Sequence, residues 1–253
     1  MKNFFKSILF FIIFLFYGFN LIAAEKSSKL LEPGWSFKGF FGKFDRAQLQ
    51  RGYQVYQEVC SGCHSVQHLS YRNLSEKGGP EFSAEEAKAI AAQFEVEDGP
   101  NSDGEMFMRP GRLSDKFVKP YPNVEASTAA NGGAYPPDMS VLAKARAGGA
   151  DYIYSLLLGY EEAPTGFELD DGGYYNKYMP GNKIKMSAPL SDGLVEYSDG
   201  TQVTTLQMAK DVTAFLVWVS EPHLEAQHRM GFKAIIYLFI LLTLVYMSKK
   251  KVC

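Results

Sequence analysis

Two long apolar runs lie near the two ends of the 253-residue chain and frame a mixed middle part. The first extends from Ile8 to Phe19, and the second extends from Met230 to Met247 with only Lys233 as an interruption. At 1.5 Å per residue the second run makes a helix of about 27 Å, which crosses a bilayer core when Lys233 reaches the interface. The pattern predicts one transmembrane helix near the C-terminus.

The middle of the chain shows apolar residues at three- and four-residue spacing, which is typical of amphipathic helices. One such helix is predicted to begin at the N-cap Asp45, to form a capping box with Gln48, and to run through Val59. It would deliver Cys60 at its end. Further helices are predicted over 84–94, 151–158 and 206–219, the last one ended by Pro222.

Glycine- and proline-rich segments separate these helices. Residues 80–125 are polar with little periodicity outside the predicted helix, residues 131–138 form a turn segment, and 166–200 is rich in loops with a small hairpin expected around Ser198–Gly200. The sequence therefore predicts a mainly α fold with long loops, followed by one C-terminal transmembrane helix.

The two termini predict the location of the chain. Residues 1–24 resemble a secretory signal peptide, with Lys2 and Lys6 before the apolar run and two alanines at its end. Three lysines, 249–251, follow the second run, and the positive-inside rule places this tail in the cytoplasm. We expect a signal peptide (1–24), a periplasmic domain (25–220), an anchor helix (221–248) and a cytoplasmic tail (249–253) in a bacterial inner membrane. An uncleaved N-terminal anchor is the alternative.

The motif Cys60-Ser61-Gly62-Cys63-His64 has the spacing of a c-type haem attachment site. Two thiols three residues apart can add to the two vinyl groups of one haem, and the adjacent imidazole can bind the iron. A zinc knuckle needs four ligands, and the chain has only one further cysteine. A thioredoxin-like redox pair and a plain disulfide between the two cysteines are also compatible with this spacing. The motif predicts one covalently bound haem c, so residues 25–220 are expected to form a mono-haem c-type cytochrome domain.

The sixth iron ligand has more than one candidate. His68 is too close to His64 in sequence to reach the opposite haem face, and the two remaining histidines lie at the membrane boundary. Met186 stands in an irregular Pro- and Gly-containing loop that can hold a thioether over the iron, and Met179 is the second candidate. An open sixth position would instead indicate a haem enzyme or a gas sensor.

The charge of the middle part is acidic. Six of the 26 basic residues lie in the leader, the second apolar run or the tail, whereas all 28 acidic residues lie between them, so the exported part carries about −8. This balance argues against nucleic acid and suits a basic soluble partner.

Several segments in the right order resemble the cytochrome c1 family. They are the stretch from Arg51 to Arg72, Pro136 to Ser140, Ala145 to Tyr152, Pro180 to Pro189 and the terminal pattern from Ala209 to Gly231. The resemblance covers nearly all of the chain after the signal. It implies the membrane-anchored haem c subunit of the ubiquinol–cytochrome c reductase complex, which carries electrons and is not an enzyme by itself.

The resemblance also implies roles for residues and partners. His64 and Met186 would be the two iron ligands, Arg146 would meet a haem propionate, and Asn131 and Tyr152 would line the haem. The implied partners are cytochrome b, the Rieske iron–sulfur protein as electron donor, a soluble or tethered c-type cytochrome as acceptor, and membrane lipid. Because the chain lacks cysteines for the extra disulfide of some bacterial relatives, packing with Pro180 and Pro189 is expected to hold the distal loop.

Overall fold

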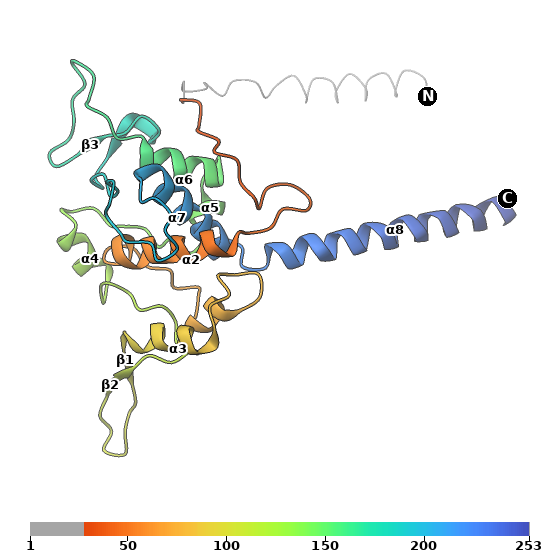
Figure 1. The fold of residues 1–253 in the computed structure, drawn as a ribbon, viewed down its shortest axis with the longest axis horizontal. Coiled ribbons are helices and arrows are strands. Elements are labelled where there is room, and N and C mark those ends of the chain that lie inside the picture. Colours follow the sequence, from red (N-terminus) through yellow and green to blue (C-terminus); the bar gives the residue numbers. More distant parts are fainter. Residues whose placement is uncertain (1–27, 253) are drawn as a thin grey trace, which may run out of the picture.

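The computed structural model describes residues 28–252, which form a helical domain and one long helix that projects from it (Figure 1). The signal peptide predicted over 1–24 lies outside the described residues. The elements in chain order are α2 (Arg46–Val55), a π-helix η1 (Tyr56–Cys60), a 3-10 helix η2 (Tyr71–Ser75), α3 (Ala84–Ala92), β1 (Glu95–Asp98), β2 (Phe107–Pro110), α4 (Val124–Ala130), α5 (Leu142–Ala145), α6 (Gly149–Leu158), β3 (Tyr174–Tyr175), a 3-10 turn η3 (Pro180–Asn182), β4 (Lys183–Ile184), α7 (Thr205–Ser220) and α8 (Leu224–Val252).

The centre of the domain is the contact between α2 and α7 (Figure 1). At this contact Gly52 offers no side chain, and a Cβ there would lie 2.1 Å from the carbonyl oxygen of Asp211 and 2.8 Å from the Cβ of Phe215. The two helices therefore approach until their backbones touch. From Met208 to Ser220 α7 is buried at all but one position, so it is buried on every face and not only on the apolar face of the predicted amphipathic helix.

A buried polar cluster joins the same two helices. The carboxylate of Asp211 is fully buried and accepts hydrogen bonds from Gln48 Nε2 at 3.2 Å, Arg51 Nε at 2.9 Å and Gln207 Nε2 at 2.8 Å. Of the two hydrogen bonds of the predicted capping box, only the one from the Gln48 backbone N–H to Asp45 is present. Asp45 accepts from the Gln48 backbone N–H at 3.2 Å, but the Gln48 amide turns to the buried carboxylate, which needs donors more than the helix end does.

The other elements attach around this pair. Helices α5 and α6 pack against α7 on one side, whereas η2 and α3 pack together on the other side of α2 (Figure 1). Aromatic rings fill the space between them: Tyr56 stacks on Phe215 with 5.6 Å between ring centroids, and Tyr71 stacks on Phe117 at 4.6 Å. The core thus holds α2 and its continuation η1, at whose end the haem motif begins, against α7.

The predicted helices are present with shifted ends. The first is α-helical only to Val55 and continues as a π-helix to Cys60, and the second ends at Ala92 instead of 94. The helix predicted from Asp151 starts at Gly149, because Gly148 adopts a left-handed conformation with φ of 87° that begins the turn. The short helices η2, α4 and α5 carry too few periodic positions to be predicted.

The strands lie elsewhere than predicted. The hairpin expected around Ser198–Gly200 is absent from residues 28–252, where two antiparallel pairs, β1–β2 and β3–β4, are the strand pairings. Asp199 accepts from the Thr201 N–H at 2.9 Å and pairs with Arg51 at 2.6 Å. This turn is tied to α2 by its side chain, so its flanks do not pair with each other.

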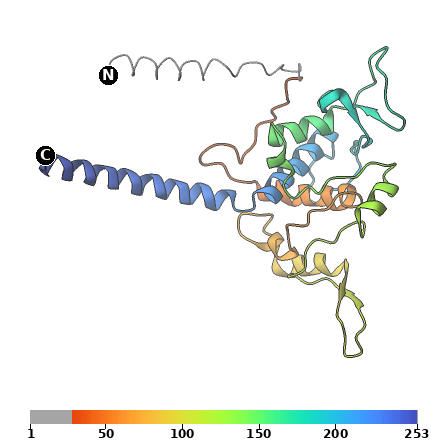
Figure 2. The same cartoon turned by 180° about the vertical axis from the view of Figure 1, so that it is seen from behind.

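Helix α8 meets the requirements for crossing a membrane. Its segment Leu224–Lys251 has a mean hydropathy of 2.0 over the apolar window, and none of that window is buried against the domain. Figure 2 shows it leaving the domain as a single straight helix. Since this apolar window is not buried in the domain, lipid is the solvent that its composition fits.

We predict that Gly52→Ala destabilises the domain by at least about 2 kcal/mol, because the added methyl group forces two backbones apart. Denaturant unfolding monitored by circular dichroism measures the loss. Gly62→Ala is the matched control, since no atom lies within 4 Å of its Cβ position and its stability should change by less than about 0.5 kcal/mol. Equal effects of the two substitutions would contradict the backbone contact.

Candidate haem site

The C-x-x-C-H motif follows a change in helix type. The N–H of Ser61 donates to the carbonyl oxygen of Tyr56 at 2.8 Å, which is the five-residue step of a π-helix. The N–H groups of Cys63 and His64 then both donate to the Cys60 carbonyl oxygen, at 3.1 and 2.9 Å. The motif is thus wrapped around one carbonyl group. Single π turns are frequent at functional sites, and the sequence pattern gave no sign of this one.

The two thiols have different surroundings. Cys60 packs against the hydrophobic core, and burial raises the pKa of its thiol to about 12. Cys63 is exposed. Both thiols are free, so the two cysteines do not form a disulfide in this structure. One thiol is held in place by the core while its neighbour stays accessible, and both remain available for thioether bonds.

His64 is oriented by a residue 73 positions away in the sequence. Its Nδ1 lies 2.9 Å from the carbonyl oxygen of Pro137, which makes Nδ1 the protonated nitrogen and leaves Nε2 with its lone pair. Burial lowers the pKa of the imidazole against the opposing effect of this hydrogen bond, so the neutral form is favoured. A metal-binding histidine needs this second hydrogen bond to fix its ring and tautomer.

Asp138 holds the Pro137 segment against the motif. Its carboxylate accepts from the Ser65 hydroxyl at 2.7 Å, the Gln67 N–H at 3.1 Å and the Ser140 N–H at 2.8 Å. Burial opposes ionisation of Asp138, but these donors outweigh it and keep its pKa below the ordinary value. The carbonyl that orients His64 is therefore fixed by an ionised side chain, a role that the sequence did not reveal.

A second group of predicted residues gathers at the start of α6. The charge of Arg146 is close enough to Tyr152 to act on its phenol, although burial dominates and raises the Tyr152 pKa. The Tyr152 hydroxyl donates to Met179 Sδ at 3.5 Å. Arg146 is exposed, and within residues 28–252 its guanidinium donates only to the Ala145 carbonyl oxygen at 3.3 Å. Its fork is therefore available for a carboxylate ligand.

The loop that carries Met186 is fixed by two residues that the sequence analysis did not single out. The Tyr160 hydroxyl donates to the Met186 carbonyl oxygen at 3.1 Å. Asn176 is fully buried, donates to the Leu156 carbonyl oxygen of α6 at 2.7 Å and accepts from the Tyr178 N–H at 3.0 Å. The expectation that proline packing holds this loop is thus incomplete, because side-chain hydrogen bonds to α6 and its C-terminal end attach it.

Asn131 has a structural contact of its own. It is the C-cap of α4, and its Nδ2 donates to the Ser127 carbonyl oxygen at 2.7 Å. Met179, the second candidate ligand, has its sulfur engaged by Tyr152, whereas no side-chain hydrogen bond occupies the Met186 sulfur within the described residues. A weak contact of this kind does not prevent a thioether from binding iron, so Met186 stays the predicted ligand and Met179 the second candidate.

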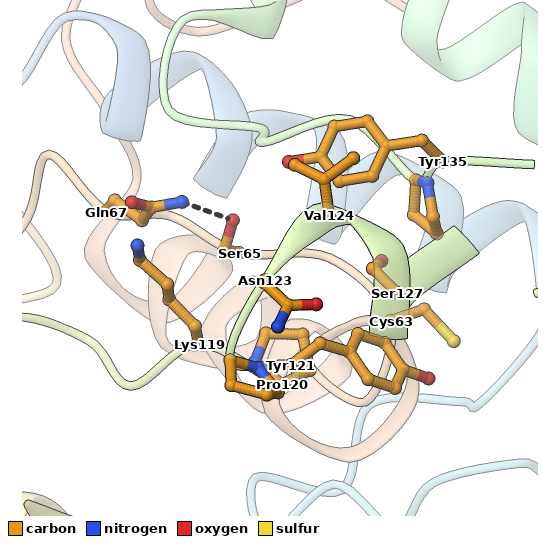
Figure 3. A pocket seen from close by; sticks show the side chains of 12 residues that line it. Cys63, Ser65, Gln67, Lys119, Pro120, Tyr121, Asn123, Val124, Ser127 and Tyr135 are labelled. Carbon is orange, nitrogen blue, oxygen red and sulfur yellow. Dashed lines mark hydrogen bonds between the residues drawn. The ribbon is translucent and has the colours of Figure 1, made fainter. Parts of the chain in front are cut away.

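A shallow polar pocket opens beside Cys63 (Figure 3). Its walls come from three segments, and the Gln67 amide donates to the Ser65 hydroxyl along one side. Neither His64 nor Met186 lines it, so the pocket alone does not hold the predicted ligand set. The lining residues are Cys63, Ser65, Gln67, Lys119, Pro120, Tyr121, Pro122, Asn123, Val124, Ser127, Tyr135 and Pro136.

These groups fit the requirements of a c-type haem. The motif offers two free thiols and an imidazole with Nε2 unengaged, and the loop beyond α6 offers a thioether. Both groups are attached to the same support, because α2 and α6 each pack on α7. The fold and the site together define a mono-haem c-type cytochrome domain with one apolar C-terminal helix.

Comparison with known proteins identifies the family. The model of the cytochrome C1 family matches residues 35–253, and this chain belongs to that family. It is 44% identical over 243 residues to cytochrome c1 of Rhodospirillum rubrum, covering 90% of this chain and 88% of that protein. It is 50% identical over 229 residues to the mitochondrial cytochrome c1-2 heme protein of Solanum tuberosum, covering 89% and 87%.

A third relative is longer. The chain is 48% identical over 249 residues to cytochrome b/c1 of Bradyrhizobium diazoefficiens, covering 91% of this chain but only 36% of that protein. Members of the cytochrome c1 family carry a c-type haem and are subunits of the cytochrome bc1 complex. The resemblance on which the sequence analysis relied is therefore confirmed.

We predict that Asn176→Ala detaches the Met186 loop, because a buried carbonyl oxygen and a backbone N–H each lose a partner, at about 1–3 kcal/mol apiece. Limited proteolysis should cut the loop faster, and urea unfolding should show a lower stability. Lys185→Ala is the control within the same loop, since its contact with the Asp171 carbonyl oxygen is exposed. Unchanged cleavage in the Asn176 variant would show that different contacts hold the loop.

Proposed function

We propose that this chain is the haem c subunit of a ubiquinol–cytochrome c reductase complex in a respiratory chain. In this proposal it receives electrons from the Rieske iron–sulfur protein and passes them to a c-type cytochrome. The observation that carries the proposal is the C-x-x-C-H turn, in which His64 is fixed by the Pro137 carbonyl oxygen with Nε2 left for iron. Haem c bound there supplies the one-electron redox chemistry.

Each site residue has a proposed task. Cys60 and Cys63 would hold the haem through thioether bonds, and His64 and Met186 would be the two iron ligands. Arg146 binds a propionate through its free guanidinium fork, and Tyr152 and Asn131 line the haem on the α6 and α4 sides. The Met186 thioether favours the reduced iron more than a second histidine would, which suits acceptance of an electron from a high-potential donor.

A haem enzyme or gas sensor with an open sixth position is the second candidate. The different contacts of the two loop methionines, Met179 and Met186, argue against an open sixth position. The Tyr152 hydroxyl engages the Met179 sulfur, while Tyr160 holds the backbone of Met186 and leaves its thioether free. A loop attached in this way favours a fixed sixth ligand over an open position.

The location that we propose follows from the ends of the chain. The signal peptide (1–24) directs the haem domain (25–220) to the bacterial periplasm, the anchor segment (221–248), which contains most of α8, holds it in the inner membrane, and residues 249–253 form a cytoplasmic tail. Cytochrome b and lipid would surround α8, whose apolar window is not buried in the domain.

The acidic surface bears on the electron acceptor. The segment from Glu161 to Asp171 is less negative than its sequence indicates, because Glu161 pairs with Lys177 and Asp170 pairs with Lys183 at 3.1 Å. The net charge of the domain still favours an acceptor with a basic face, through long-range attraction that salt screens. We therefore propose a basic soluble or tethered c-type cytochrome as the acceptor.

We predict that Met186→Leu lowers the reduction potential and lets the ferrous haem bind carbon monoxide, because the sixth ligand is lost with little change in apolar volume. Redox titration and the carbon monoxide difference spectrum measure the two effects. Met179→Leu is the matched control in the same loop and should leave both unchanged. If Met179→Leu changes the potential and allows carbon monoxide binding while Met186→Leu does not, Met179 is the ligand. Carbon monoxide binding by the unaltered chain would favour the haem enzyme or gas sensor with an open sixth position.

Purification of the full chain from its native membrane tests the function as a whole. We expect cytochrome b and a Rieske protein to co-purify, quinol to reduce the haem of this chain, and the intact mass of the chain to include one haem. A preparation with covalent haem but without quinol-dependent reduction would contradict the proposed donor.

A further inference from the structure

The segment from Trp35 to Phe44, just before α2, folds into a closed loop on the side of the domain from which α8 leaves (Figures 1 and 2). The Lys43 N–H donates to the Ser36 carbonyl oxygen at 3.0 Å and joins the two ends of the loop. The Gly42 N–H donates to the Gly39 carbonyl oxygen at 3.1 Å and closes a tight turn at its tip. The loop therefore has a defined shape, with residues 40 and 41 at the centre of the turn.

The base of the loop is buried and its tip is exposed. Trp35, Phe37 and Phe44 pack into the core, whereas Phe40 is 47% exposed and Phe41 is 75% exposed. The central positions of turns are usually occupied by polar residues, Gly or Pro. Two exposed phenylalanines at such a tip have no role in the packing of the domain, and clustered exposed apolar residues mark interaction surfaces.

The tip lies against α8 at the level where the apolar run of that helix begins. The Phe40 and Phe41 rings contact the Phe232 ring, with 6.0 and 5.9 Å between centroids. Phe232 is itself 44% exposed and follows Met230, the first residue of the run. Phe40 and Phe41 thus form one apolar surface with Phe232, at the end of the apolar run of α8 that lies nearest to the domain.

The loop is held in this position by polar contacts with the first turns of α8. Glu225 accepts from the Phe44 N–H at 2.9 Å and from the Arg46 guanidinium at 2.7 and 2.9 Å. His228 Nδ1 lies 3.2 Å from the Gly42 carbonyl oxygen. Since both partners precede the apolar run, the polar contacts stay on the aqueous side while the phenyl rings point along the apolar side.

We propose that the turn Gly39–Gly42 is a second membrane contact of this chain, with Phe40 and Phe41 inserted into the interfacial layer of the bilayer that α8 crosses. The occupant of this surface is lipid, because the surface is continuous with the lipid-facing helix, and the exposed Lys43 beside it is placed to meet phosphate headgroups. The proposal rests on the assignment of α8 as a membrane anchor. Two attachments fix the tilt of the domain, which one helix leaves free, and α2 transmits that tilt to the haem motif.

Photo-crosslinking in the full chain tests this contact. Phe41 is replaced with p-benzoylphenylalanine, which keeps the phenyl ring and reacts with nearby C–H bonds, and the protein is placed in vesicles of phosphatidylethanolamine and phosphatidylglycerol. Phe107, 44% exposed on β2, is the matched control away from α8, and Leu238 within the apolar run reports on the anchor itself. Intact mass spectrometry detects adducts, and the absorption spectrum of the haem checks the fold of each variant.

We expect several-fold more lipid adduct at position 41 than at position 107, and strong lipid adducts at position 238. Lipid adducts at 238 with none at 41 would overturn the second contact and leave the anchor intact. Absence of adducts at 238 would overturn the anchor, and the loop contact with it. Adducts of position 41 with protein alone, when the same variant is irradiated within the complex in its native membrane, would overturn lipid as the occupant.

Discussion

The backbone contact of α2 with α7 is the constraint that places every part of the site. It exists because position 52 has no side chain and because the buried carboxylate of Asp211 is fully supplied with donors from both helices. A buried charge without such partners would cost several kcal/mol, so the cluster specifies one register of the two helices. The haem motif begins at the end of η1, which continues α2, and α6 also packs on α7. The same contact therefore sets the positions of both halves of the site.

The site itself is built from carbonyl groups and buried polar side chains more than from packing. Pro137 orients His64 through its carbonyl oxygen, Asp138 fixes that segment, and Asn176 attaches the distal loop to α6. Each of these contacts satisfies a polar group that would otherwise be buried without a partner. Rigidity at an electron-transfer site has a physical purpose, because a ligand set that does not rearrange between oxidation states lowers the reorganisation that each transfer requires.

The membrane end of the molecule uses a similar division between polar and apolar contacts. Glu225 ties the chain before α2 to the first turn of α8, while the phenylalanines at the loop tip lie against Phe232. Domain and anchor are therefore joined by side chains as well as by the peptide chain. The proposed electron transfer benefits from a defined orientation of the domain, because transfer depends on the direction in which the haem edge faces.

Features that depend on neighbouring residues could be predicted from the sequence: the attachment motif, the apolar run of α8, and helices whose periodicity and caps are local, such as α3 with its Ser83 capping box. The order of the motifs also indicated the family, which is confirmed, whereas the choice of Met186 over Met179 as ligand stays a prediction. Contacts between groups that are far apart in the sequence could be identified only in the folded chain. The partner of His64 is 73 residues away, the Gln48 amide leaves its own helix for Asp211, and Asn176 stands in a loop without periodicity. Such contacts follow from the burial of polar groups in one particular packing, and no local pattern of residues records that packing.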